Sequence, residues 1–178
     1  MNGPLFLAIT PDQQTRSVLA QMLVPFGSTG RIPGKPSSPD NWHITVRFLD
    51  SHDAVTVDRL TAELDQAKWP GPFKVNLSGF GAFPNGDKAT VLWAGVNSDA
   101  LHELAAAVEE VVIAVGIEPE ERPYRPHLTL SRIRPPVDIN DLLEDSWGRL
   151  SFTADELVLY ESRTEGGTHY HPIEWFPL

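Results

Sequence analysis

The chain of 178 residues contains no cysteine and has few basic residues. Without cysteine it has no disulfide framework, no thiolate metal site and no cysteine nucleophile. Its 14 Lys and Arg stand against 24 Asp and Glu, and the resulting net charge of −10 excludes a broad basic face that coats nucleic acid. The apolar run Leu5–Ile9 is far shorter than the roughly 20 residues of a membrane helix. With no basic leader segment at the N-terminus, these absences favour a soluble cytoplasmic protein without a membrane contact.

The hydrophobic patterning predicts both strands and helices. Apolar or alternating β-branched runs predict strands near 5–9, 42–49, 73–79, 90–96, 127–131, 150–160 and 169–176. Helices are expected after the capping box Thr10–Gln13 as far as Pro25, over 56–67, and from Ser98 or Asp99 to Gly116. The hairpin-like strand pairs are not separated by helices, which indicates an α+β fold with helices outside an antiparallel sheet.

Two four-residue segments repeat one pattern, His-x-Thr-x with apolar x. They are His43–Val46 and His127–Leu130, 84 positions apart, which suggests an internal duplication. Side chains along a strand alternate between faces, so the His and Thr of each copy share one face, and Arg47 is expected there as well. If the two halves pack about a pseudo-twofold axis, two imidazoles and two hydroxyls converge on one surface.

Paired imidazole and hydroxyl groups suit an anion that is attacked in line. Two hydroxyls can hold the oxygens of a phosphate while the imidazoles stand on opposite sides of the phosphorus. With reference pKa values near 6.5, one ring can remove a proton from water while the other donates a proton to a leaving alkoxide. A five-membered cyclic phosphate is already strained, and the scheme requires no metal ion and no cofactor.

Basic residues cluster beside the second His-x-Thr segment. Arg122, Arg125, Arg132 and Arg134 fall within 13 positions, which makes this stretch a candidate anion site. The alternative interpretation is that these arginines pair with acidic residues close by in the sequence, namely Glu118, Glu120 and Glu121.

These motifs and their surroundings resemble the 2H phosphoesterases, which are named for two His-x-Thr or His-x-Ser motifs. Within that superfamily the chain is similar to the bacterial and archaeal RNA 2′,3′-cyclic phosphodiesterases, also called 2′-5′ RNA ligases. The resemblance extends over nearly all of the chain, through Leu5–Ile9, Asn41–Leu49, Phe80–Pro84, Val91–Val96 and Arg125–Arg132. It implies a single bilobal domain over residues 1–178, with two pseudo-symmetric antiparallel-sheet lobes, outer helices and a central cleft.

The resemblance also implies roles for the residues of both motifs. His43 would be the general acid that protonates the leaving O3′, and His127 the general base that activates water, so that the product is a 2′-phosphate. Thr45 and Thr129 would hold the phosphate together with Arg132, from the arrangement His-x-Thr-x-x-Arg. Reversible 2′-5′ RNA ligation would extend the same chemistry. Strict alternation places Arg132 on the face opposite His127, so its role requires the strand to end or bulge, or the side chain to curl back.

Aromatic and histidine side chains outside the motifs allow further interpretations. Phe6 and Tyr124 are the candidates for lining the cleft and stacking on a nucleobase. His169 and His171 share a strand face, as metal pairs do, but no third ligand follows by spacing, and no metal site is predicted. The expected partners are RNA 3′ ends or small nucleotides that carry a cyclic phosphate, with no obligate protein partner.

Two other functions remain open from the residues alone. The same chemistry would serve another small cyclic phosphate, such as an ADP-ribose cyclic phosphate or a cyclic nucleotide. A noncatalytic module that binds RNA ends or nucleotides is the second alternative. Binding alone, however, does not need two matched titratable rings.

Overall fold

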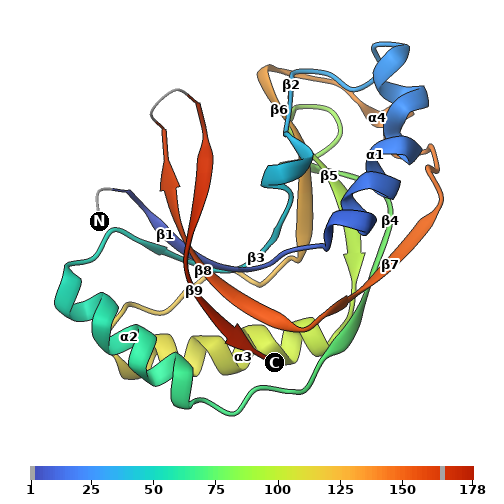
Figure 1. Ribbon diagram of the computed structural model, residues 1–178. Helices are drawn as coiled ribbons and strands as arrows, with labels where there is room; N and C mark the ends of the chain where they lie inside the picture. The colour runs from blue at the N-terminus through green and yellow to red at the C-terminus, as the bar shows by residue number, and fades with distance from the viewer. Residues whose placement is uncertain (1–2, 165–166) are drawn as a thin grey trace.

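The computed structural model of the protein describes residues 3–164 and 167–178. Over these residues the chain forms one antiparallel sheet of nine strands, strongly curled, with helices outside it (Figure 1). The strands are β1 (Leu5–Ile9), β2 (Lys35–Pro36), β3 (Ile44–Asp50), β4 (Phe73–Phe83), β5 (Ala89–Asn97), β6 (His127–Val137), β7 (Arg149–Ala154), β8 (Glu156–Arg163) and β9 (His169–Pro177). The helices are α1 (Gln13–Ser28), α2 (Ala54–Gln66), α3 (Asp99–Ala114) and α4 (Asn140–Leu143). The α+β architecture expected from the sequence is confirmed.

The sheet consists of two halves that meet at β3 and β6. The strand order is β7-β4-β5-β6-β3-β1-β8-β9, and β2 pairs with β6 outside this path. We call β7-β4-β5-β6 the β6 half and β3-β1-β8-β9 the β3 half. Between the halves, β3 and β6 are registered through a single pair, Ile44 with Leu128. The two lobes of the molecule are therefore two halves of one continuous sheet.

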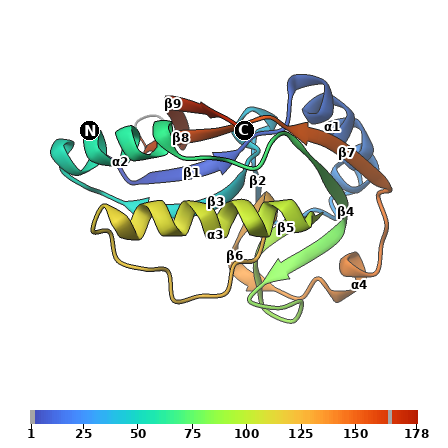
Figure 2. The same ribbon diagram turned by 90° about the horizontal axis from the view of Figure 1, so that it is seen from below.

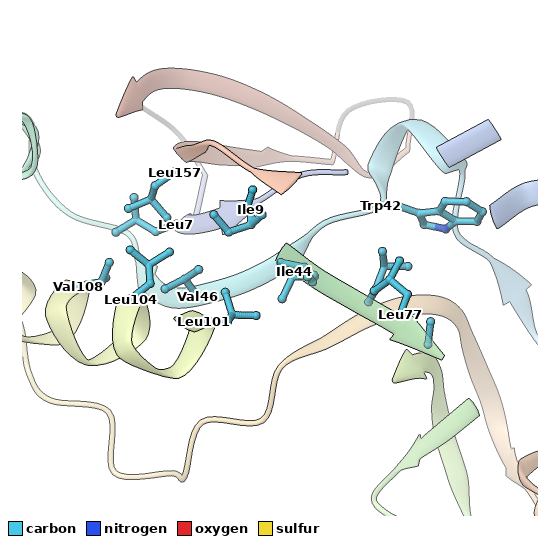
Figure 3. Packing of buried hydrophobic residues seen from close by; sticks show 14 of the residues in the cluster. Leu7, Ile9, Trp42, Ile44, Val46, Leu77, Leu101, Leu104, Val108 and Leu157 are labelled. Atoms are coloured by element: carbon cyan, nitrogen blue, oxygen red, sulfur yellow. The ribbon is translucent and has the colours of Figure 1, made fainter. Parts of the chain in front are cut away.

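The helices cover the outer side of each half. Figure 2 shows α2 and α3 lying along the β3 half and α1 beside β7 in the β6 half. Leu101, Leu104 and Val108 of α3 recur at helical spacing and point toward Leu7 and Val46 of the sheet (Figure 3). These side chains are buried, so the outer helices fix the curvature of the sheet and leave its inner side for the functional groups. Within the described ranges, no helix is long and apolar enough to cross a membrane.

Helix α1 differs from the expected helix at both ends. Its N-cap is Asp12, whose side chain accepts hydrogen bonds from the backbone N–H and the hydroxyl of Thr15, so the expected capping box at Thr10 is wrong by two residues. The helix also continues past Pro25 to Ser28. There Phe26 packs edge-on against Phe80 at 5.1 Å, and this packing stabilises the last turn beyond the proline.

The strand expected at 150–160 is two strands. β7 pairs with β4, whereas β8 pairs with β1 and β9, and these partners lie in different halves of the sheet. The chain must therefore leave one half and enter the other, and it does so at Asp155. Pattern alone predicts extended backbone on both sides of this residue but does not predict which strands will pair with it.

Candidate functional site

The two His-x-Thr segments lie side by side at the junction of the two halves. Ile44 and Leu128, the apolar residues inside the two motifs, pair with each other and are fully buried toward the helices. Because neighbouring residues of a strand point to opposite faces, the four other motif side chains point to the inner side of the sheet. These are His43, Thr45, His127 and Thr129. The pseudo-twofold convergence expected from the duplication thus passes through one buried residue pair.

The two imidazoles are oriented by matching hydrogen bonds. His43 Nδ1 lies 2.7 Å from the carbonyl oxygen of Asn41, and His127 Nδ1 lies 2.7 Å from the carbonyl oxygen of Arg125. A carbonyl oxygen only accepts, so Nδ1 carries the proton in both rings. In this tautomer Nε2 of each ring carries no proton and is the nitrogen available for proton transfer.

Aromatic rings hold each imidazole from the side. The ring of Tyr170 meets His43 edge-on at 4.8 Å, and the ring of Phe83 meets His127 in the same way at 4.8 Å. Phe6 also contacts His43, at 4.9 Å between ring centroids. Each histidine is therefore fixed by one backbone hydrogen bond and at least one aromatic contact, which restricts its rotation.

A β-bulge brings Arg132 to the site. Along β5, Leu92 pairs with Ser131 and Trp93 with Thr129, so Leu130 is an extra residue in β6. Beyond the bulge the alternation is inverted: Ser131 is fully buried, and Arg132 lies on the same face as Thr129. The strict alternation that placed Arg132 on the opposite face does not hold here.

The same bulge occurs in the first motif. Leu7 pairs with Arg47 and Ala8 with Thr45, so Val46 is the extra residue in β3, and it precedes Leu130 by the same 84 positions. Here the inversion turns Arg47 away from the inner face and onto α3, where its Nε donates to Glu109 at 2.6 Å. The expectation that the Arg47 side chain projects beside His43 and Thr45 is therefore wrong, although Arg47 still contributes to the lining of the aromatic cavity. Phe48 occupies the position that matches Arg132.

Phe48 is a site residue that the sequence reasoning missed. Its side chain is 51% exposed although it is a large apolar group, and it lines the inner cavity. The signal was present, because the 84-residue offset that pairs the two histidines also pairs Phe48 with Arg132. The two motifs thus carry different groups at equivalent positions, a ring in one and a cation in the other.

Two cavities open on the inner side and share Thr129 and Arg132. The larger, about 530 Å³, is lined by Thr45 and His127 and by the aromatic residues Phe48, Phe83 and Tyr124. The smaller, about 290 Å³, is lined by polar groups that include His43. We call them the aromatic cavity and the polar cavity. A group held by Thr129 and Arg132 would lie between them, within reach of both histidines.

Burial and the neighbouring cation lower the pKa of both histidines. Burial lowers the pKa of His43 to about 4, with smaller contributions from the charges of His127 and Arg132. Burial is also the main cause that lowers the pKa of His127, and Arg132 adds to it. Both rings of the free protein are therefore neutral at neutral pH, and a bound anion would raise both pKa values.

The two expected base-stacking residues differ in exposure. Phe6 is 3% exposed, and its ring is stacked on Tyr160 at 5.3 Å and covered by Tyr170 and His43. Phe6 has no free face for a nucleobase, so the expectation that it stacks on a base does not fit the structure. Its ring packs against His43 instead. Tyr124 lines the aromatic cavity, and its hydroxyl donates to the carbonyl oxygen of Thr45 at 3.1 Å.

The arginine cluster divides between the two interpretations. Arg122 binds Glu120 through its side chain, as local pairing predicts, and holds the pKa of Glu120 down at about 2. Arg122 and Glu120 also line the aromatic cavity, together with Arg125 and Arg132. The described residues contain no group of three or more His, Asp or Glu arranged to hold a metal ion.

The loop that carries Tyr124 is tied to α3 by a partly buried ion pair. Glu109 accepts from Nε of Arg47 through one oxygen and from the backbone N–H of Glu120 through the other, at 2.6 and 2.7 Å. A second guanidinium nitrogen of Arg47 donates to the carbonyl oxygen of Glu118. The Arg47–Glu109 pair therefore positions one wall of the aromatic cavity.

Comparison with known proteins identifies the family. Residues 35–166 match the 2′-5′ RNA ligase superfamily, and the chain belongs to it. It is 31% identical to the RNA 2′,3′-cyclic phosphodiesterase of Methanocaldococcus jannaschii over 96% of this chain and 99% of that protein. It is 32% identical to the protein of that name from Aeropyrum pernix, over 65% of this chain and 66% of the relative. The crystal structure of E. coli LigT complexed with 3′-AMP superposes with a TM-score of 0.76, at 26% identity, over 99% of this chain and 98% of that one.

Replacing Glu109 by Gln should loosen the loop that carries Tyr124. The substitution removes the negative charge beside the nearly buried Arg47, and we expect the free energy of unfolding to fall by about 1–3 kcal/mol. Urea unfolding measures the change. Glu110→Gln, on the exposed side of the same helical turn, is the matched control and should stay within about 0.5 kcal/mol of wild type. Equal stability of the two variants would contradict the positioning role of Glu109.

The buried His43 should make the protein less stable as the pH falls from 6.5 toward 4. Its pKa is about 4 when folded and about 6.5 when unfolded, so over this window the unfolded chain takes up a proton that the folded protein does not. Replacing His43 by Gln removes this contribution, up to about 3 kcal/mol at its full extent. Urea unfolding at pH 7.5 and 4.5 measures it: the wild type should lose more stability than the variant between the two values. An equal loss in both proteins would argue against a buried, neutral His43.

Proposed function

We propose that the protein hydrolyses 2′,3′-cyclic phosphates at RNA ends to 2′-phosphates by acid–base catalysis with two histidines. The proposal is supported by the pairing of the two motifs, which places His43 and His127 at two cavities that share Thr129 and Arg132. Nδ1 of each ring is bound to a carbonyl oxygen, so Nε2 is the nitrogen available for proton transfer. The names of the relatives support the choice of substrate, since both are RNA 2′,3′-cyclic phosphodiesterases.

The reaction begins with an attacking water on the side of His127. Nε2 of His127 takes a proton from the water, whose oxygen forms a bond to phosphorus. The bond from phosphorus to O3′ breaks, and Nε2 of His43 gives its proton to O3′. The phosphate stays on O2′, His127 is left protonated and His43 neutral, and exchange with solvent restores both. With a 5′-hydroxyl in place of water, the same steps would join two RNA ends through a 2′-5′ linkage. In the reverse direction O3′ would attack the phosphorus and the 5′-hydroxyl would leave, which cleaves that linkage.

The phosphate itself would be held by the hydroxyls of Thr45 and Thr129 and by the guanidinium of Arg132. Negative charge grows on the non-bridging oxygens in the transition state, and fixed donors stabilise it most when water is excluded. Arg132 lines both cavities, so its guanidinium can stay in contact with the phosphate while the bond to water forms and the bond to O3′ breaks. The aromatic cavity beside it offers Phe48 and Tyr124 as surfaces for the nucleobase.

The assignment of the acid to His43 follows the order of the two motifs in the family. Burial lowers the pKa of His43 to about 4 in the free protein, so the bound phosphate must raise it before the ring can carry a proton at neutral pH. An anion in contact with the ring does this, and burial strengthens the effect because the surrounding dielectric is low. Substrate binding and protonation of His43 are therefore coupled in this mechanism.

Substituting either histidine should abolish most of the activity. With a uridine 2′,3′-cyclic phosphate substrate and a chelator present, we expect His43→Ala and His127→Ala each to lower kcat by about 10²–10⁴-fold, the usual contribution of general acid–base catalysis. The product, analysed by chromatography, should be the 2′-phosphate. His52→Ala is the control, because this ring lies outside both cavities and should leave the rate unchanged.

A substrate with sulfur in place of O3′ separates the two roles. A thiolate leaves without protonation, so His43→Ala should regain most of its lost rate on this substrate, whereas His127→Ala should stay slow. Rescue of His127→Ala in place of His43→Ala would exchange the acid and the base. Unchanged rates in all variants on both substrates would refute the two-histidine mechanism.

The pH dependence of kcat/KM should have its maximum below pH 6.5. This parameter reports the free enzyme, in which the pKa values of both histidines are lowered, so both limbs of the bell lie on the acid side of the ordinary imidazole value. The profile of kcat reports the complex and should lie at higher pH, because the bound phosphate favours the charged ring. A kcat/KM maximum well above pH 7 would contradict the lowered pKa values.

A further inference from the structure

The segment that precedes the first motif is fastened to the strand that carries the second. Lys35 of β2 pairs with Arg132 of β6, and Pro36 pairs with Ser131. The hydroxyl of Ser131 donates to the carbonyl oxygen of Pro33 at 2.5 Å. β2 thus pairs with the edge of β6 at Ser131 and Arg132, beyond the single pair through which β3 and β6 are joined.

Gly34 shows how closely this segment lies on β6. Its φ is +78°, a conformation that side chains disfavour, and a Cβ at this position would overlap the backbone carbonyl of Arg132. The N–H of Ser37 donates to the carbonyl oxygen of Leu130 at 2.8 Å, which fixes the far end of the segment. Lys35 is therefore held beside Arg132 by its backbone on both sides, although it lies in a stretch rich in Gly, Pro and Ser.

Lys35 lines the polar cavity together with three other groups that carry or can carry positive charge. These are Arg132, His43 and His169. The remaining lining of this cavity within residues 3–164 and 167–178 is neutral, and no Asp or Glu contributes to it. In a chain with a net charge of −10 such a lining is unusual, and it makes the cavity a local site for an anion.

The opposite wall of the polar cavity supplies neutral hydrogen-bonding groups. The side-chain amide of Asn41 donates to the carbonyl oxygen of Thr168 at 3.0 Å and links the turn before the first motif to the segment before β9. Ser37 and Ser38 add hydroxyls on the side of Lys35. The cavity is therefore polar on both sides, in contrast to the aromatic cavity across Arg132.

We propose that the polar cavity binds the phosphodiester next to the cyclic phosphate, with Lys35 as the main contact. The inference rests on the proposed function and deepens it.

An RNA end offers a flat base, the reactive phosphate and, one nucleotide upstream, a second phosphate. The aromatic cavity suits the base, and Thr129 and Arg132 hold the reactive phosphate. The polar cavity, which shares these two residues, accepts the second phosphate. The preferred substrate class is thus an oligoribonucleotide end, and a nucleoside cyclic phosphate lacks one contact.

The test compares two substrates, uridine 2′,3′-cyclic phosphate and the dinucleotide that carries the same cyclic end. Wild type should have the higher kcat/KM on the dinucleotide. In Lys35→Gln the ratio of the two kcat/KM values should fall about tenfold, mainly through KM, as expected for one lost hydrogen bond to a charged group. Lys35→Arg should restore most of the ratio because it keeps the charge. Lys74→Gln, an exposed lysine of β4 outside both cavities, is the matched control.

A dinucleotide with an uncharged methylphosphonate linkage removes the charge of the second phosphate from the substrate. Wild type should hydrolyse it with a kcat/KM no higher than that for uridine 2′,3′-cyclic phosphate, and Lys35→Gln should not lower this kcat/KM further. If Lys35→Gln reduces the rates on both substrates equally, or if the methylphosphonate is as good a substrate as the phosphodiester, the second phosphate site does not exist. If wild type hydrolyses neither cyclic phosphate, the proposed function itself fails. The two failures are therefore distinguishable.

Discussion

The pairing of Ile44 with Leu128 is the contact on which the arrangement of the site depends. Each residue is the apolar centre of one His-x-Thr motif, and burying both against the outer helices commits their neighbours to the inner side of the sheet. A shift of either strand by one residue would turn its histidine and threonine into the core, where their burial without partners is costly. Hydrophobic burial behind the sheet therefore fixes the register that brings the two imidazoles together in front of it.

The two bulges that follow the motifs are equivalent in position but present different side chains to the inner side of the sheet. Both occur one residue after the threonine, at Val46 and Leu130, and both invert the alternation in the same way. The inversion presents Phe48 from one strand and Arg132 from the other. One motif thereby adds an aromatic ring to the cavity lining and the other adds a cation, which we propose bind the base and the phosphate. A duplicated backbone thus gives an asymmetric site suited to a nucleotide, which is itself apolar at one end and anionic at the other.

The electrostatics of the protein are local. A net charge of −10 repels a polyanion at a distance, whereas Lys35, Arg125 and Arg132 gather at the cavities. Such a distribution favours short or terminal substrates over long duplexes. The lowered pKa values of the histidines follow from the same arrangement, since both rings are largely buried and lie near the positive charge of Arg132. In the proposed mechanism, a bound phosphate would offset the charge of Arg132 and so permit protonation of a ring.

Much of the fold and of the candidate site could be predicted from the sequence, because periodicity and motif spacing are local properties. They indicated the α+β class, most helices and strands, and the two His-x-Thr segments. Sequence alone could not reveal that Ile44 pairs with Leu128, that Asp155 lies between strands of different halves, or that Lys35 lies beside Arg132. It proposed Arg132 for the site but could only name a bulge as one way for it to get there, and it misplaced Arg47 and Phe6. A bulge and an aromatic cluster decide which face of a strand is free. Alternation along a strand is set by the chain itself, but its interruption is set by the strands that pair with it, and those partners are known only once the chain has folded.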